Sequence, residues 1–523
     1  MTNASYAQTG QPDAAQIRTQ VERMTKSEIF ANSPQLSAFL LFVVEALLRG
    51  KSERLKGYTI GVEVLRRDVN FDPQMDPIVR VEATRLRRAI ERYYAGPGAS
   101  DAVVIALPRG GYVPRIAWRG TPEAEVAEPS ARAKPPRLLP GNGLPTLRVA
   151  PFVVVGTPGP LVIDGEALGS KLAEAFALFE MVNVVAAAPA ASGGRYDYRL
   201  DGALEYRGEG TVCLRFKLVD KTDETVIWSR TLEAGCAEAV PEIEQKVILE
   251  LATTIVQRFG IIWSHERRRQ LATDAGDPRY RAMIEVGESF RSFDPLRAQE
   301  ELERLTTLDP SFAAGFSYLA AIHAVGYVHG FTDPGDGTAL DRALKFARRG
   351  VELRPHSAFA YHILFIVLFF RGETEAARAA AENAIALNPY DLAMRADYGG
   401  RLIFAGEVDK GMEMLRNTAP SGTILPAWTH FYLFLGHYLR DELAEARFHA
   451  GQLINDTHIY GRLAQALIAR RDGQVDEARR MIESITTAQP HWKDDPRREI
   501  GKLITGSRLA DRLTRELAAA GLT

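Results

Sequence analysis

Five arginines and one threonine gather within a short stretch near the amino-terminal end of the chain. Guanidinium groups can form bidentate hydrogen bonds with guanine edges or bind phosphate oxygens. This chemistry serves nucleic-acid recognition rather than bond breaking. The alternative is a basic helix face that only meets water. The stretch holds Arg80, Thr84, Arg85, Arg87, Arg88 and Arg92.

A helix must position these side chains. At about 100° per residue, the apolar residues of the segment fall within one narrow arc, and the arginines spread around the opposite side. Glu91 is the only acid on the arginine side. The pattern therefore predicts a helix that packs one face on a core and offers the other to a partner. Its apolar arc consists of Val79, Ala83, Leu86 and Ile90.

The flanking residues predict a small domain around this helix. Before it, residues 33–50 carry apolar side chains at helical spacing, which indicates a core helix. After it, Val103, Ile105 and Leu107 alternate as a strand, residues 109–111 form a turn, and Tyr112 begins the return. Helices followed by a β-hairpin with an arginine near its tip are typical of a winged helix-turn-helix.

This part of the chain resembles the OmpR-type winged-helix domain of bacterial regulators of the ToxR, CadC and HilA kind, over about 80 residues. The resemblance rests on Thr84 to Arg88 in the helix and on the hairpin from Val104 to Tyr112. The chain departs from that family in lacking a clear amino-terminal β-sheet and in its loop around Phe71 and Asp76. Those departures leave open that the fold has been reused for protein contacts.

The resemblance implies a role for each polar residue. Base contacts in the major groove are expected from Arg80, Thr84, Arg87 and Arg88, and phosphate contacts from Arg85 and Arg92. Arg109, at the tip of the wing, is expected at a neighbouring phosphate or in the minor groove. Tyr112 is expected to hold the wing on the domain core.

Composition supports a basic amino-terminal domain on an otherwise acidic chain. The 523 residues suggest three or four domains. Residues 1–119 hold 17 of the 64 Lys and Arg residues and 12 of the 66 Asp and Glu residues. Their formal net charge is therefore +5, and that of the remaining residues is −7. Double-stranded DNA is therefore the partner expected for this domain alone. Neither a signal peptide nor an apolar run long enough to span a membrane is found, so the sequence predicts a cytoplasmic protein without a membrane partner.

Residues 120–146 read as a linker, because they hold six prolines and almost no large apolar side chain. The segment 147–262 then alternates strand and helix patterns. Strands are expected at 147–155, 182–188, 198–206, 211–219 and 225–232, and a helix at 165–179. A long closing helix is expected from apolar residues four apart, namely Ile243, Val247, Leu251, Ile255 and Phe259.

This block resembles the TolB amino-terminal domain of multidomain bacterial regulators. The resemblance rests on the runs 199–202, 214–220 and 226–229, which keep their order and spacing over about 110 residues. Cys213 falls inside a strand pattern and is predicted to be a buried free thiol, since neither cysteine has CxxC spacing.

Residues 277–520 read as helical repeats. Pro355 and Pro389 are 34 residues apart, as are Gly372 and Gly406, and Gly473 follows 67 residues later. A period of 34 residues resembles the tetratricopeptide repeat, whose concave face binds proteins or peptides. A plain helical domain is the alternative.

No pattern in the chain predicts catalysis, a metal site or a cofactor. The run from Gly165 to Lys171 is one residue short of a phosphate-binding loop and has Ser before Lys, so it predicts a helix start. His323 and His329 are six apart, as are His356 and His362, which favours surface or capping roles over metal binding.

The sequence thus predicts a multidomain α+β protein: a winged-helix DNA-binding domain at 15–119, a linker at 120–146, a TolB-like α/β domain at 147–262 and tetratricopeptide-like repeats at 277–520. The function expected is a transcriptional regulator that is not an enzyme and whose later domains sense a signal or recruit a partner. A homodimer is one open arrangement. An adaptor that binds only proteins is the alternative. A signalling protein related to rhizobial adenylate cyclases is a weaker alternative function, because the first domain is too small to be a cyclase domain.

Overall fold

The computed structural model describes residues 12–31, 33–65, 78–108, 111–119, 143–159, 161–186, 196–207, 210–235, 237–272, 277–292, 295–329, 338–418, 428–453, 459–489 and 491–522. Predictions about Arg109, Cys236 and most of the linker lie outside the described residues. The chain has a mixed α+β architecture and divides into two compact units, Met1–Pro136 and Arg137–Thr523.

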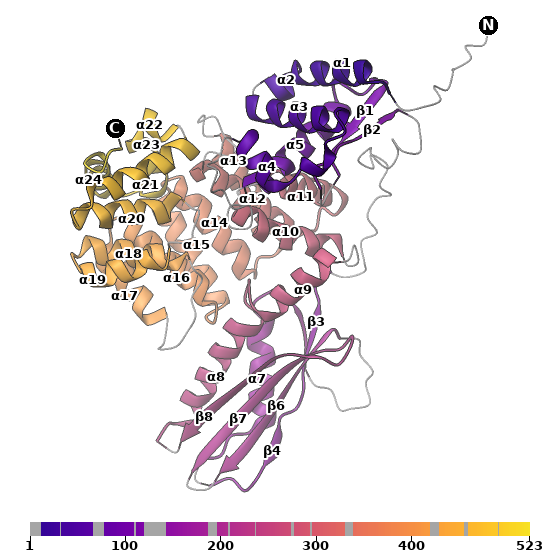
Figure 1. The fold of residues 1–523 in the computed structure, drawn as a ribbon. Coiled ribbons are helices and arrows are strands. Elements are labelled where there is room, and N and C mark those ends of the chain that lie inside the picture. The colour runs from indigo at the N-terminus through magenta and orange to yellow at the C-terminus, as the bar shows by residue number, and fades with distance from the viewer. Residues whose placement is uncertain are drawn as a thin grey trace. The chain divides into compact units, whose positions relative to one another are not determined.

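The first unit packs helices around one apolar core and ends in a two-stranded hairpin (Figure 1). Asp13 caps the first helix by accepting hydrogen bonds from the backbone N–H groups of Ala15 and Gln16. The elements are α1 (Ala14–Thr25), α2 (Glu28–Ala31), α3 (Pro34–Leu48), the 3-10 helix η1 (Ser52–Arg54), α4 (Gly57–Glu63), α5 (Ile78–Ala95), β1 (Val103–Ala106) and β2 (Arg115–Trp118).

The hairpin differs from the prediction in its return strand. Val103 pairs with Trp118 and Ala106 with Arg115, so the second strand begins at Arg115 rather than at Tyr112. Pro108 and Pro114 flank the connection, and proline cannot donate to a strand ladder, which explains the longer loop.

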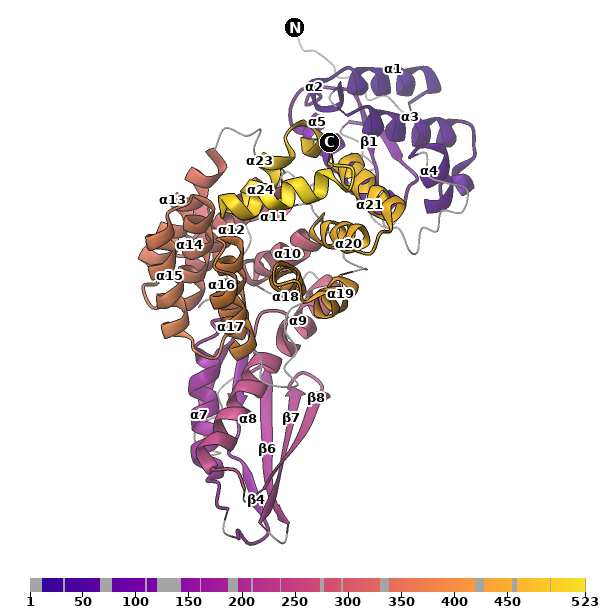
Figure 2. The same cartoon turned by 90° about the vertical axis from the view of Figure 1, so that its left-hand side faces the viewer.

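The second unit begins with a six-stranded sheet in the order β5-β3-β6-β7-β8, with β4 also paired to β6. Figure 2 shows α7 and α8 on the same side of this sheet, where their apolar faces share its core. The elements are β3 (Thr146–Val149), β4 (Val153–Val155), α7 (Gly165–Ala177), β5 (Asn183–Ala186), β6 (Tyr198–Arg207), β7 (Thr211–Asp220), β8 (Val226–Gly235), α8 (Val240–Ile255) and α9 (Ile261–Ala272).

Most predicted elements of the sheet domain are confirmed. The inward residues of β7 are buried, among them Val212, Leu214 and Phe216, and Cys213 is a buried free thiol. The predicted strand 147–155 is instead two strands, because Pro151 interrupts the backbone donors between them. Phe259 was assigned wrongly to the closing helix, which ends at Ile255; Phe259 has a φ of 69° and is 40% exposed.

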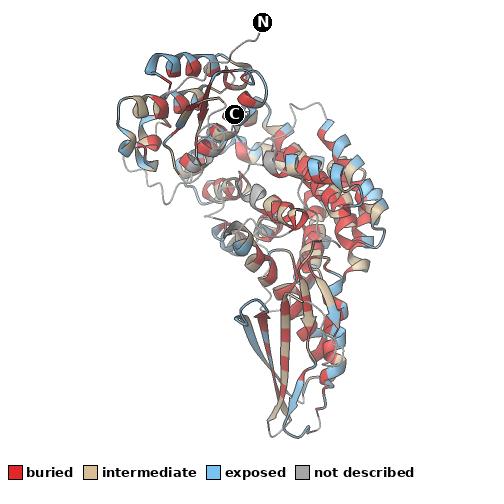
Figure 3. Cartoon of the chain, turned by 90° about the vertical axis from the view of Figure 1, so that its right-hand side faces the viewer, coloured by how far each residue is buried: buried red, intermediate tan, exposed pale blue. Residues whose placement is uncertain are grey.

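The rest of the second unit is an array of helix pairs. Its helices are α10 (Pro278–Ser292), α11 (Leu296–Leu308), α12 (Ala313–His329), α13 (Thr338–Leu353), α14 (Ala358–Phe370), α15 (Thr374–Leu387), α16 (Leu392–Phe404), α17 (Val408–Thr418), α18 (Thr429–Leu439), α19 (Leu443–Gly451), α20 (Ile459–Arg471), α21 (Val475–Ala488), α22 (His491–Asp494), α23 (Pro496–Leu503) and α24 (Ser507–Ala518). Figure 3 shows buried residues running through these helices.

Four of the pairs share one turn geometry. The residue at each turn has a positive φ: 73° at Gly372, 95° at Gly406, 64° at Asp441 and 76° at Gly473. The following amide closes the turn by donating to a carbonyl five residues earlier, as Glu407 N does to Leu402 O at 2.8 Å. Asp441 is therefore the member of the series that the glycine spacing alone could not reveal.

Candidate functional site

Helix α5 is held by the face that the sequence predicts. Val79, Ala83, Leu86 and Ile90 are all buried in the core of the first unit, which confirms the apolar arc. Burying this stripe fixes the rotation of the helix about its own axis.

Two of the expected phosphate-contacting arginines are exposed. Arg85 and Arg92 both have exposed side chains. Arg85 also bonds to Glu82 at 2.8 Å, and the carboxylate of Glu82 is almost fully buried. One edge of the Arg85 guanidinium is therefore held while the rest of the group faces solvent.

The guanidinium of Arg87 lies between the helix and the hairpin loop. It donates to the carbonyl oxygens of Leu107 at 3.0 Å, Pro108 at 3.2 Å and Gly111 at 2.8 Å. The sequence predicts a base contact for this residue, and the structure gives its donors a role inside the domain. Arg87 thereby sets the position of the hairpin relative to α5.

The side chains of Arg80, Thr84 and Arg88 lie outside the described part of the structure, as does Arg109. Their expected contacts therefore stay predictions. Arg115 was missed in the sequence: it is exposed on β2 opposite Ala106 and adds a positive charge to the hairpin. Arg115 lies at the start of β2 because of the pairing register of the two strands, and the alternation of apolar residues in the sequence does not predict that register.

Tyr112 holds the hairpin loop on the core, as predicted. Its ring lies 6.5 Å from that of Phe39, centroid to centroid, and packs at the edge of the core of the first unit. Together with Arg87 it gives the loop two independent attachments, one apolar and one by hydrogen bonds.

A buried carboxylate at the opposite end of the hairpin was not foreseen. Asp101 accepts hydrogen bonds from Gln20 at 2.7 Å, Arg23 at 2.7 Å and Tyr93 at 2.6 Å. Burial alone would raise the pKa of Asp101, but these donors outweigh it and lower the pKa below its ordinary value. The cluster joins α1, α5 and β1, so its role is structural.

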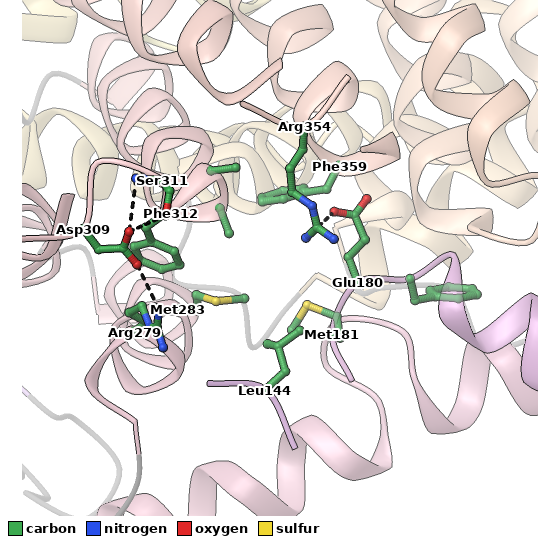
Figure 4. A pocket seen from close by; sticks show the side chains of 13 residues that line it. Leu144, Glu180, Met181, Arg279, Met283, Asp309, Ser311, Phe312, Arg354 and Phe359 are labelled. Carbon is green, nitrogen blue, oxygen red and sulfur yellow. Dashed lines mark hydrogen bonds and ion pairs between the residues drawn. The ribbon is translucent and has the colours of Figure 1, made fainter. Parts of the chain in front are cut away.

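The second unit contains a cavity of about 320 Å³ between the sheet domain and the helical array (Figure 4). A volume of this size suits a small molecule. Two methionines and three phenylalanines contribute to its apolar walls, and two charged pairs lie at its ends. The lining includes Glu180, Met181, Arg279, Met283, Asp309, Ser311, Phe312, Arg354 and Phe359.

Glu180 marks the point where the sheet domain enters the array. It follows α7, has a φ of 56°, and bonds to Arg354 at 3.3 Å. Burial raises the pKa of Glu180, while Arg354, Ser357 and the first amides of α14 limit the rise. Arg354 is half exposed, so its remaining donors face the cavity and the solvent.

At the other end of the cavity, Arg279 is buried between two carboxylates. It bonds to Asp277 and to Asp309, each at 2.9 Å. Asp309 also accepts from Ser311. Charged groups at this end are paired within the protein, whereas the Arg354 side chain at the other end is half exposed.

Several contacts join the sheet domain to the array. Asn388 donates to the Leu178 carbonyl at 3.2 Å, and Gln257 to Asp391 at 3.3 Å. The Arg258 guanidinium lies 3.9 Å from the ring centroid of Phe359. These contacts explain why the two predicted domains form one compact unit.

The motifs examined for metal or phosphate binding can be placed in the described part of the chain. No group of three or more His, Cys, Asp or Glu residues there could hold a metal ion. Surface or capping roles were predicted for His323 and His329. A surface role is wrong for both, because they are buried; His323 stacks on Phe346 at 5.7 Å, and His329 lies in the last turn of α12. Lys171 bonds to Glu244 at 2.6 Å, and the run that contains it begins α7, as predicted.

Comparisons with known proteins place few constraints on this chain. No family model matches it, and no curated protein matches it. Among solved structures, a variant of the PelC dodecamer from Paraburkholderia phytofirmans is 22% identical, over 23% of this chain and 94% of that chain, with a TM-score of 0.18. A TM-score this low supports no conclusion about fold or function. Among the described residues, no helix is both long enough and apolar enough to span a membrane.

Proposed function

We propose that the chain is a transcriptional regulator whose first unit is a winged-helix domain that binds double-stranded DNA. The proposal rests on how α5 packs in the first unit. Its apolar stripe is buried, Arg85 and Arg92 are exposed, and Arg87 ties the helix to a hairpin that carries exposed Arg115. A rigid basic helix beside a basic hairpin suits a major groove and its flanking phosphates.

In this proposal Arg80, Thr84 and Arg88 read bases. Arg85 and Arg92 bind phosphates, as do Arg115 and Arg109 from the hairpin. Arg87 contributes in two ways, by holding the hairpin and by adding positive charge beside the groove. The second unit, with its TolB-like sheet and tetratricopeptide-like helix pairs, senses a signal or recruits a partner.

The cavity at Glu180 and Arg354 is where we place a small signal molecule. The methionines and phenylalanines fit an apolar body, and the free donors of Arg354 fit a carboxylate. Ala314 lines the cavity, so Ala314→Trp would fill it. If the Ala314→Trp variant still responds to the signal molecule, the sensing site is not this cavity.

Genome-wide crosslinking and sequencing of the full chain tests DNA binding. The test variant changes Arg80, Arg87 and Arg88 to Ala. The matched control changes three exposed arginines of the second unit, Arg479, Arg508 and Arg515. Discrete peaks kept by the control and lost by the test variant are expected. Absence of peaks from the unmodified chain would reject the proposal.

An adaptor that binds only proteins is the second candidate. The internal use of Arg87 favours it, since that residue is less available to DNA than the sequence suggests. Salt dependence separates the two, because phosphate neutralisation makes log affinity fall steeply with log salt concentration. A cyclase-related function has no support from the described residues, as Lys171 bonds to Glu244 rather than being free for a phosphate.

A further inference from the structure

The helix pairs of the second unit form two layers. The first helices of the pairs contact one another along the array, as α12 does α14 and α18 does α20, and these are the inner helices. The second helices, among them α11, α13 and α15, pack mainly on inner helices and form the outer layer (Figure 1). The outer surface of the array is therefore made by side chains that the outer helices turn away from the inner ones.

The outer helix α13 carries an exposed basic face. Its apolar side is buried. One exposed acid of this helix, Asp341, pairs with Arg371 at the end of α14, so its charge is already neutralised. The exposed bases of α13, which form the basic face, are Arg342, Lys345, Arg348 and Arg349.

Little of the positive charge of the basic face is neutralised within one copy of the chain. Arg349 bonds to Glu352 at 3.2 Å, but both side chains are exposed, so the pair contributes little. The other three bases have no acid partner in the described part of the chain. By contrast, Arg480 on the outer helix α21 pairs with Glu477. The basic face of α13 is therefore available to a negatively charged partner.

The outer helix α11 carries an acidic face formed by Glu300 and Glu303. Both are exposed, and because they are three residues apart they share one side of the helix. Glu303 accepts a hydrogen bond from Gln299 at 2.9 Å, an uncharged donor that leaves the carboxylate charge unneutralised. The nearby Arg304 is bonded instead to Glu301. The acidic face is therefore available to a positively charged partner.

The acidic and basic faces are neighbours, because α11 and α13 both pack on α12. Burial lowers the pKa of His323 on α12, Arg342 lowers it further and Glu303 raises it, so both charged groups lie close to this one ring. His323 also stacks on Phe346 of α13, with 5.7 Å between ring centroids. No ion pair joins the two faces in the described part of the chain. The outer surface thus has an acidic strip next to a basic strip.

We propose that the acidic face of α11 and the basic face of α13 form a homodimer interface, in which each face meets the opposite face of a second copy. A twofold axis along the seam between α11 and α13 brings the faces together in this way, and every contact then occurs twice. Since Glu303 and Arg342 both lie beside His323, we expect Glu303 of one copy to meet Arg342 of the second.

Duplex DNA fits this surface less well than a second copy does. The next outer helix, α15, also exposes two acids, Glu375 and Glu382. Phosphates on the basic face would therefore have acids on neighbouring helices, whereas a second copy offers both signs of charge. The ion pairs are exposed, so the dimer should be weak and should dissociate at high salt. The inference concerns the second unit alone and does not depend on DNA binding.

Charge-reversed variants of the full chain test the interface by sedimentation velocity over a range of concentrations. Arg342→Glu with Lys345→Glu turns the basic face acidic, and Glu300→Lys with Glu303→Lys turns the acidic face basic. Each double variant alone should self-associate about tenfold more weakly than the unmodified chain. An equimolar mixture of the two variants should form a dimer again, because each face then meets the opposite charge.

Matched reversals at other exposed sites of the second unit are the controls. Glu413→Lys with Glu445→Lys changes two acids, and Arg508→Glu with Arg515→Glu changes two bases. Both controls should self-associate like the unmodified chain. Circular dichroism checks that every variant is folded. If a double reversal unfolds, the single changes Arg342→Gln and Glu303→Gln remove charge without reversing it and are measured in the same way.

Several outcomes would overturn the proposal. An unmodified chain that stays monomeric at every concentration would do so, as would self-association that neither double reversal weakens. Weakening by the basic-face variant alone, or a mixture that does not dimerise, would place the acidic partner outside α11. If the basic-face variant lowers the affinity of the chain for a duplex and the acidic-face variant raises it, DNA rather than a second copy occupies α13.

Discussion

Arginines in the two units of this chain have opposite surroundings. In the first unit, Arg85 and Arg92 are exposed on a helix whose other face is buried. In the second, Arg401 on α16 is buried against Asp397 and lies over the rings of Phe365, Phe369 and Phe370. The same residue type serves a solvent-facing surface in one place and internal stability in the other.

The buried arginine belongs to a polar cluster between inner helices of the array. Asp397 accepts from Arg401 at 3.1 Å and from Tyr432 at 2.5 Å, and lies 2.9 Å from His362. Burial would raise the pKa of Asp397, but Arg401, His362 and Tyr432 lower it far below its ordinary value. The comparison teaches that arginine content alone does not define a surface that a partner can reach, because burial decides whether the guanidinium faces solvent or the interior.

The largest effect is expected from breaking the buried pair. Asp397→Asn leaves the Arg401 charge without its counterion, and should lower the free energy of unfolding by about 3–5 kcal/mol. Asp409→Asn is the control, because Asp409 bonds to Arg440 at 2.6 Å with its own side chain 91% exposed. Urea denaturation followed by circular dichroism compares them. Similar losses would show that burial does not distinguish these pairs.

The next effect concerns Arg87 in the first unit. Arg87→Ala should weaken specific DNA binding by about 1–3 kcal/mol. Arg87→Lys keeps the charge but cannot reach all three hairpin carbonyls, so it should recover only part of the loss. Titration of the full chain with a cognate duplex measures both. Full affinity in the alanine variant would remove Arg87 from the recognition surface.

A smaller effect is expected from pH at a histidine cluster of α18 and α19. His449 lies beside His430, with 2.9 Å between their Nδ1 atoms, and burial followed by the neighbouring histidines lowers the pKa of His449 to about 4. The unfolded chain binds this proton near the ordinary value of 6.5 and the folded chain does not. Protonation of His449 should therefore leave the free energy of unfolding unchanged above pH 6.5 and lower it as the pH falls toward 4.

Substitution tests the source of that pH dependence. His449→Gln should flatten the fall in melting temperature between pH 6.5 and about pH 4, whereas His356→Gln, at an exposed histidine, should leave it unchanged. An unchanged slope in the His449 variant would assign the dependence to other groups.

The smallest effect is expected from the exposed arginines themselves. Arg85→Ala and Arg92→Ala should each weaken binding to all duplex sequences alike and lower the slope of log affinity against log salt by about 1. Arg447→Ala in the array, where Arg447 bonds to Asp472, is the control. A sequence-dependent loss would move Arg85 or Arg92 from phosphates to bases.

Local pattern predicted much of the fold. The burial of Val79, Ala83, Leu86 and Ile90, the strands β6 to β8 and the start of α7 all follow from periodicity and helix capping. Prediction was incomplete at one turn of the helical array. The glycine spacing does not identify the turn at Asp441. Asp441 has a left-handed backbone there, which aspartate can adopt as well as glycine.

The candidate sites were less predictable than the elements that carry them. The sequence singled out Arg87 but not its three carbonyl acceptors, which come from a loop twenty or more residues away. Glu180 and Arg354 are 174 residues apart and meet only because the sheet domain docks on the array. Neither partner carries a local signal of its pairing.

By itself, the sequence determined the elements, the basic character of the first unit and the helical period of the second, since these depend on neighbours along the chain. The tertiary structure decided which arginines are exposed, where the cavity lies and which charged faces of the outer helices are neighbours. Those outcomes depend on burial and on partners far away in sequence, because packing and desolvation act between segments that local patterns do not relate.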